Sequence, residues 1–342
     1  MSAPAAPGVV KRWAAGARNE GWVDVLFVPV VIIGLGIYFS IASPYFLTSL
    51  NITNLLIQGS ILAFVAFGVT FVILAGELDL SVGSGVGLVS VLAATVMRDQ
   101  DSVLLGIIAA FAVGIAIGAV NGFVVTKLEV PSFIATFGML VIANGIALAI
   151  TDGGVVTGVP IDIGNLALKS LLGVRWMIWL VVIVFIVLYV IQTQTAFGRR
   201  VMAVGGNREA ARLAGIPVNR VRFFVFLVSG ATIAIGGLAL TSRVVSGQPN
   251  GGTLLELDAV AAIVIGGTSI FGGRGSLVRT LFGVLLIAEL RNGLDLVGVG
   301  DDLKQVIIGA VLILAASVAF IRGRIRIPYA MGKPPPKEET TT

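Results

Sequence analysis

Long apolar stretches alternate with short polar segments along nearly the whole chain. Several of them approach or exceed the ~20 residues that an α-helix needs to cross ~30 Å of hydrocarbon. They lack the alternation of barrel strands, so helices are the structures that can satisfy their backbone groups in lipid. We therefore predict an all-α, polytopic membrane protein with about ten spans, near residues 23–42, 52–75, 81–97, 104–126, 132–150, 177–195, 222–242, 256–271, 277–297 and 303–321.

Composition agrees with this pattern and narrows the chemistry. Of 342 residues, 57% are hydrophobic and 12% are charged, about half the charged share of an ordinary soluble domain. The chain contains no cysteine and no histidine. This excludes thiolate nucleophiles, disulfides, Cys/His metal sites and Ser-His arrangements. We expect no metal site, no cofactor in this chain and no enzymatic activity.

One short motif is typical of a membrane enzyme. Gly298 to Asp301 matches the Gly-x-Gly-Asp pattern of intramembrane aspartyl proteases. Those enzymes need a second aspartate on a facing helix, because two carboxylates must share a proton. No Tyr-Asp pair occurs in the chain, so we expect Asp301 to cap the last span instead.

The basic residues predict the orientation. Placing the N-terminus inside puts 17 lysines and arginines on the cytoplasmic side and 6 on the other side, together the 23 of the chain. This bias predicts that both termini are cytoplasmic. Residues 1–21 are expected to be a disordered basic N-terminus, 22–325 a transmembrane domain, and 326–342 a disordered tail. The basic residues are dispersed among the spans, so no nucleic-acid partner is expected.

The polar segment 198–222 is organised like a helix, a glycine and a second helix. Asn207 is a good N-cap, and Glu209 follows in the first turn, where the helix dipole favours a negative charge. Gly215 is placed to end the short helix, and Pro217 suits the first turn of the next one. An ordinary cytoplasmic loop would not need such capping.

The same short helix has the features of a docking element. Its small alanines, Ala210, Ala211 and Ala214, permit close approach, and Arg208 and Arg212 lie four residues apart on one face. A helix that lies in the groove of a partner protein needs such a surface. We therefore predict a cytoplasmic helix that binds a soluble partner.

Two glycine-rich breaks interrupt the apolar pattern. The first, residues 76–85, contains Glu77, Asp79 and Ser81. A carboxylate at mid-membrane costs at least ~2.5 kcal/mol, so these acids should be paired, wet or at a boundary. Asp79 or Ser81 can cap the next span, or the turn can act in mechanics or in a pathway. The second break, residues 266–276, lacks the Lys-Ser or Lys-Thr of a phosphate loop, so we expect no ATP site.

Small residues recur at every fourth position of the fourth predicted span. At that spacing they make one flat helix face, which a neighbouring backbone can approach closely. The face predicts either static packing or a sliding contact of a transporter. Its members are Gly106, Ala110, Gly114, Gly118 and Gly122.

These motifs together resemble a known family. Residues 207–216 resemble the Glu-Ala-Ala loop of ABC importer permeases. Residues 76–85 resemble the Gly-Gly-Ile-Asp-Leu-Ser-Val-Gly signature of the ribose/xylose/galactose permeases, with Glu77 replacing the second glycine. Asn121-Gly122, residues 130–136 and residues 266–276 also match that family, and the likeness runs from about residue 23 to 325.

The resemblance implies a type II importer-like permease in a bacterial cell membrane. It implies a second permease copy, a cytoplasmic ATPase with tandem nucleotide-binding domains that holds ATP and Mg, an extracytoplasmic binding protein, and a monosaccharide substrate. The loop 198–222 would couple the permease to the ATPase. Its coupling residues would be Asn207, Arg208, Glu209, Ala210, Ala211, Arg212, Leu213 and Gly215.

The substrate pathway is only weakly marked. A neutral sugar needs hydrogen-bonding groups without strong charge, and from Asn54, Gln58, Asn121, Thr136 and Asn144 we select Asn54, Gln58 and Asn144. Each of these side chains could equally form a hydrogen bond between two helices. The alternative function is a secondary transporter driven by an ion gradient, which needs an ionisable site within the membrane. Glu289 would be its carrier.

Overall fold

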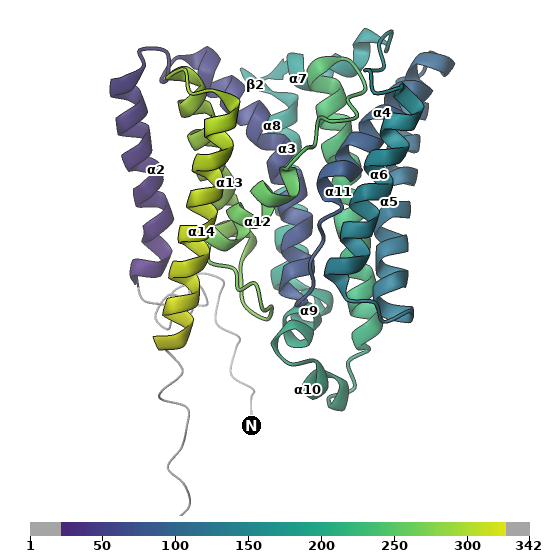
Figure 1. The fold of residues 1–342 in the computed structure, drawn as a ribbon, viewed down its shortest axis with the longest axis vertical. Coiled ribbons are helices and arrows are strands. Elements are labelled where there is room, and N and C mark those ends of the chain that lie inside the picture. The colour runs from purple at the N-terminus through teal and green to yellow at the C-terminus, as the bar shows by residue number, and fades with distance from the viewer. Residues whose placement is uncertain (1–21, 326–342) are drawn as a thin grey trace, which may run out of the picture.

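The computed structural model describes residues 22–325, which form a bundle of helices (Figure 1). The predicted disordered segments 1–21 and 326–342 lie outside the described residues. The helices are α2 (Trp22–Ala42), α3 (Ser49–Leu74), α4 (Val82–Gln100), α5 (Val103–Lys127), α6 (Ser132–Thr151), the 3-10 helix η1 (Ile161–Gly164), α7 (Asn165–Leu168), α8 (Trp176–Gln194), α9 (Ala196–Gly206), α10 (Arg208–Leu213), α11 (Val218–Val244), α12 (Leu255–Ile265), α13 (Leu277–Leu296) and α14 (Asp301–Ile325).

A helix occupies each of the ten predicted ranges, which confirms the all-α, polytopic class. Within the described residues, six helices are long and apolar enough to cross a membrane: α3, α4, α5, α6, α8 and α11. The apolar part of α2, Phe27–Ala42, is shorter. The count of ten membrane crossings therefore stays a prediction.

The eighth range, 256–271, is not a full span as expected. Helix α12 has only 11 residues, about 16 Å at 1.5 Å per residue. It ends at Gly266, where a Cβ atom would lie 2.4 Å from the Arg279 carbonyl oxygen, and Gly267 has φ +85°. Irregular chain flanks α12 on both sides, inside the bundle between α3 and α13 (Figure 1). Non-helical backbone at membrane depth is tolerated where protein buries it.

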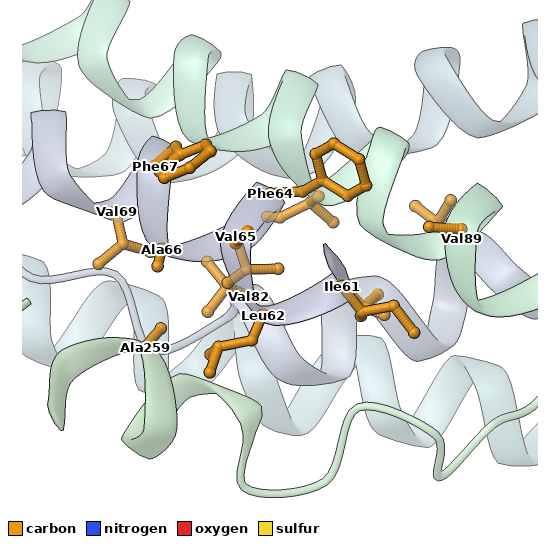
Figure 2. Packing of buried hydrophobic residues seen from close by; sticks show 14 of the residues in the cluster. Ile61, Leu62, Phe64, Val65, Ala66, Phe67, Val69, Val82, Val89 and Ala259 are labelled. Carbon is orange, nitrogen blue, oxygen red and sulfur yellow. The ribbon is translucent and has the colours of Figure 1, made fainter. Parts of the chain in front are cut away.

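Helix α3 is the core of the bundle. From Ile61 to Leu74 its residues are all buried, as expected of a helix that is hydrophobic on every side. It packs against α11, α13, α12 and α8. Figure 2 shows side chains of α3 pointing out on opposite sides of the helix, among them Phe64 and Leu62, with Val89 of α4 and Ala259 of α12 nearby.

The predicted flat face of small residues exists, and most of it packs against α11. A Cβ atom on Gly114 would lie 2.5 Å from the Gly230 carbonyl oxygen, and one on Gly118 would lie 2.3 Å from that of Phe226. A Cβ atom on Gly122 would lie 2.9 Å from a ring carbon of Phe223 and 3.2 Å from its carbonyl oxygen. The face allows α5 and α11 to contact each other through their backbones.

The two ends of the bundle differ. Helices α9 and α10 project from one end, where α2 begins and α14 finishes (Figure 1). The other end carries η1, α7 and a small antiparallel hairpin of β1 (Ser170–Leu171) and β2 (Val174–Arg175). The hairpin joins Ser170 to Arg175 and Leu171 to Val174. The hydrophobic pattern did not predict it, because two-residue strands have no periodicity.

Candidate functional site

Helix α10 has the beginning and the end that the sequence predicts. The Asn207 side chain accepts a hydrogen bond of 2.9 Å from the Ala210 backbone N–H, so Asn207 is the N-cap. Gly215, with φ +77°, follows the last turn in the left-handed region that favours glycine. Pro217 lies directly before α11. The chain thus forms a capped helix, a glycine and a second helix, as expected.

The exposed surface of α10 has both apolar and charged side chains. Ala211 is buried against the bundle, whereas the Leu213 side chain is 75% exposed. Arg212 and Glu209 form an exposed ion pair of 2.6 Å. The hydrogen bond from Arg212 lowers the pKa of Glu209 from its usual value, so this carboxylate is charged at neutral pH. The surface therefore offers one apolar side chain beside one ion pair.

Arg208 and Arg212 lie four residues apart on α10, but their side chains bond to different partners. The Nη2 atom of Arg208 turns inward, donating to Glu77 Oε1 at 2.6 Å and to the Gly76 carbonyl oxygen at 3.0 Å. Glu77 also accepts from Arg222 Nε on α11 at 2.5 Å. The Glu77 side chain is only 3% exposed. Of the expected environments, paired, wet or at a boundary, the structure shows Glu77 paired, and both partners are arginines of the polar segment 198–222.

Three glycine-rich segments meet beside this ion pair. A Cβ atom on Gly205 would lie 1.8 Å from the Leu74 carbonyl oxygen, and one on Gly272 would lie 2.8 Å from the Gly76 Cα. A Cβ atom on Gly273 would lie 2.6 Å from the Gly206 Cα. The Gly273 N–H donates a hydrogen bond of 3.0 Å to the Leu74 carbonyl oxygen. We call this contact the glycine junction: Gly76, Gly205, Gly206, Gly272 and Gly273. It brings both glycine-rich breaks of the sequence to the end of α9.

Asp79 is the centre of a buried polar network. Its Oδ1 atom accepts from the Ser81 N–H at 3.0 Å and from Ser81 Oγ at 2.6 Å. Its Oδ2 atom accepts from Ser229 Oγ at 2.7 Å. Asn121 on α5 donates to Ser81 Oγ at 2.8 Å. The four side chains join the segment before α4 to α5 and α11.

The expectation that Asp79 or Ser81 caps the next span is wrong. Ser81 occupies the N-cap position of α4, but its side chain makes no capping hydrogen bond. Its hydroxyl is instead the donor to Asp79. The reason is tertiary, because Asp79 lies between two serines that both donate to it, and this network uses the hydroxyl that would otherwise cap the helix.

The extended backbone before α4 is bonded to the first turns of α6. The Leu78 N–H donates to Ser132 Oγ at 3.1 Å, and the Leu80 N–H donates to Thr136 Oγ1 at 3.1 Å. These bonds satisfy backbone donors that a helix would have used internally. They give Thr136, one of the polar residues considered for the pathway, a defined structural partner.

The three residues selected for the substrate pathway are not gathered in one place. Asn54 is exposed and Gln58 half-buried on α3, and Asn144 is half-buried on α6. Helix α3 packs mainly against α11, α13, α12 and α8, whereas α6 packs mainly against α4 and α5. Their role in transport stays a prediction.

Glu289, the residue of the alternative transport mechanism, is buried on α13. Its Oε1 atom would lie 3.1 Å from a Cβ on Gly36 of α2, and its Oε2 atom has no hydrogen-bond partner in the described part of the chain. Arg291, two residues on, pairs with Asp258 of α12 at 2.6 Å. Among residues 22–325, no group of three or more acidic side chains is arranged to hold a metal ion.

Sequence reasoning missed the partners that complete these contacts. Arg222 and Ser229 stand within or at the start of a predicted apolar span, and their polarity was the available signal. Asn51 and Asn292, which exchange hydrogen bonds of 2.9 and 2.8 Å between α3 and α13, were also missed. Each pair is remote in sequence, so no local pattern indicates which residues meet.

Comparison with known proteins gives a consistent result. The family model described as branched-chain amino acid transport system / permease component matches residues 51–316. The chain is 42% identical to the ribose import permease protein of Bacillus subtilis, over 85% of this chain and 89% of that protein. It is 34% identical to the L-arabinose ABC transporter permease protein of Azospirillum brasilense, over 88% and 89% of the two chains.

A third relative is the xylose transport system permease protein of Escherichia coli, 34% identical over 86% of this chain and 91% of the relative. No solved structure matches the chain at a significant level. The match to the family model and the long alignments include the buried network at Asp79, the glycine junction and α10. The chain therefore belongs to the family of transport-system permeases that includes ABC transporter permeases for monosaccharides.

Proposed function

We propose that this chain is the membrane permease subunit of an ATP-driven importer for a monosaccharide. The observation that carries the proposal is α10, a capped and exposed helix that is also bonded to the buried signature segment, residues 76–85. A helix with these two properties can receive a movement from a soluble partner and pass it into the membrane. The relatives named for ribose, arabinose and xylose support the substrate class.

The partner at α10 is a cytoplasmic ATPase with tandem nucleotide-binding domains. Leu213, 75% exposed, supplies an apolar anchor for a groove of that protein, and the Glu209–Arg212 pair lies beside it. Apolar anchors with polar surroundings are the usual composition of a docking helix. ATP and Mg bind to the ATPase, and its closure moves α10 to switch the permease between inward and outward access.

The orientation follows from the same partner. Helices α9 and α10 are cytoplasmic, as are the start of α2 and the end of α14, which lie at the same end of the bundle (Figure 1). Ten crossings fit this arrangement, with α12 making one of them as a short helix flanked by irregular chain. The hairpin end faces the extracytoplasmic side, where a sugar-binding protein delivers the substrate. A second copy of the chain completes the pathway.

Polar side chains of α3 and α6 contact the sugar during transport. Asn54 is exposed, and Gln58 and Asn144 are half-buried, so their side-chain amides are accessible to a ligand. Replacing Gln58 by Leu should reduce uptake without loss of the bound ATPase. The same substitution at Gln192, whose amide bonds to Leu277 and Gly275, should instead lower the stability of the fold.

One observation favours the alternative, an ion-gradient transporter. Glu289 has a buried oxygen without a described partner, and a carboxylic acid within a membrane often marks a proton pathway. In an ATP-driven importer, Glu289→Gln should leave transport nearly unchanged, because the amide keeps the size of the side chain. In a proton-driven transporter it should abolish transport.

Transport by the reconstituted complex separates the two functions. The chain, its ATPase and its binding protein are placed in liposomes with radiolabelled ribose, arabinose or xylose outside. The proposal predicts uptake of at least one sugar that needs internal ATP and is insensitive to proton and sodium ionophores. Uptake by the chain alone, driven by an ion gradient and lost in Glu289→Gln, would establish the alternative.

A further inference from the structure

Glu77 accepts hydrogen bonds from two arginines that belong to two different helices. Arg208 Nη2 of α10 and Arg222 Nε of α11 both lie within 2.6 Å of the same oxygen, Oε1. The Glu77 side chain is 3% exposed, Arg222 is 13% exposed and Arg208 is 46% exposed. The carboxylate is therefore enclosed, and Arg208 of α10 is the more exposed of its two partners.

Arg208 makes the main polar contact between α10 and the rest of the helix bundle. In the described part of the chain, it is the one residue of α10 whose side chain bonds to a residue outside 196–222. The rest of the contact is the burial of Ala211 and the packing against α9 and α11. A six-residue helix has little stability of its own, so the position of α10 depends strongly on the Arg208–Glu77 ion pair.

Glu77 is also connected, through the neighbouring backbone, to the buried polar network around Asp79. It lies two residues before Asp79 on extended backbone, and the Leu78 N–H between them is fixed by Ser132 of α6. Asp79 in turn bonds to Ser229 in the middle of α11. A shift of Arg208 would thus act on a segment that is held at several points, and coupling between sites is carried by such contiguous contacts.

We propose that Glu77 is a positioning residue that joins the docking helix to the signature segment, so that ATPase movement at α10 reaches the Asp79 network. This rests on the ATPase docking described under the proposed function.

Three variants separate this role from simple charge neutralisation. Glu77→Ala removes the carboxylate, leaves Arg208 without its acceptor and leaves Arg222 enclosed without a counter-charge, which is costly for the fold. Glu77→Ala with Arg222→Gln removes both buried charges and relieves that cost. Arg222→Gln alone leaves the Glu77–Arg208 pair in place. Each is reconstituted with the ATPase and binding protein, and uptake of the transported sugar per ATP hydrolysed is measured beside the thermal stability of the permease.

In Glu77→Ala we expect the ATPase to stay bound while uptake per ATP falls at least about tenfold, as for the loss of one hydrogen bond to a charged group. In the double variant, stability should return toward the wild-type value while uptake per ATP stays low, because α10 still lacks its partner. Arg222→Gln should keep uptake per ATP within about twofold of wild type, as expected for one pair of a partly exposed network.

Recovery of uptake per ATP in the double variant would overturn the proposal, since Glu77 would then serve only to neutralise Arg222. Unchanged uptake per ATP in Glu77→Ala would overturn it as well. In both cases the wild-type complex still transports with ATP, so the proposed function stands. A wild-type complex without ATP-driven uptake would instead overturn both.

Discussion

Ser229 Oγ donates a hydrogen bond of 2.7 Å to Asp79 Oδ2, joining the segment before α4 to the middle of α11. Asp79→Ala should remove the acceptor for both Ser229 and Ser81. Buried donors left without partners cost about 1–3 kcal/mol each, so the apparent thermal unfolding temperature of the purified permease should fall. Tryptophan fluorescence of the detergent-solubilised protein during heating measures this change.

Asp79→Asn is the matched control for this network. Its amide oxygen can still accept from Ser81, and its amide nitrogen can donate to Ser229, whose hydroxyl can reverse its role. The unfolding temperature should therefore lie between those of the wild type and Asp79→Ala. An alanine variant as stable as the wild type would contradict the assigned hydrogen bonds.

The glycine junction predicts a sharp contrast between two neighbouring glycines. A Cβ on Gly205 would lie 1.8 Å from the Leu74 carbonyl oxygen, whereas a Cβ on Gly206 would have no atom within 4 Å. Gly205→Ala should destabilise the permease by at least about 1–3 kcal/mol, as overpacking does, or prevent its insertion. Gly206→Ala should fold normally. Expression level and monodispersity after gel filtration compare them, and equal behaviour would show that the junction is not closely packed.

The α5–α11 contact predicts a second contrast. Gly118→Ala would place a methyl group 2.3 Å from the Phe226 carbonyl oxygen, so the two helices must move apart at a cost of about 1–3 kcal/mol. Gly145→Ala on α6 meets no atom within 4 Å and should be neutral or favourable by up to about 1 kcal/mol, since alanine favours the helix. Heating curves of both variants test this, and the reverse order of stability would be inconsistent with the contact.

Local features were predictable from the sequence because their causes are local. The Asn207 cap, the Gly215 terminus and the flat face that contains Gly114 and Gly118 each depend on residues within one or two helical turns. Apolar stretches located the helices for the same reason. The exception was α12, because the predicted span 256–271 extended into the glycine-rich break, whereas the helix ends at Gly266, beside Arg279.

The contacts that form the candidate site were less predictable. Arg208 lies 131 residues from Glu77, and Arg222 lies 145 residues from it. The cost of burying Glu77 predicted that it is paired, wet or at a boundary, but not which residues would pair with it. Likewise, the Asp79 network depends on Ser229, 150 residues away. For that reason the prediction that Asp79 or Ser81 caps α4 was wrong, whereas the prediction that Asn207 caps α10 is confirmed.

Copurification most directly tests the central claim that α10 binds an ATPase. The tagged chain is purified from its native membrane in mild detergent, beside Glu209→Lys, which reverses one charge of the exposed docking surface, and Gly206→Ala as a folded control. We predict that a tandem-domain ATPase accompanies the wild type and the control in stoichiometric amount, and that it is lost from Glu209→Lys while that variant stays monodisperse. An ATPase retained in full by Glu209→Lys, or absent from the wild type, would contradict the account.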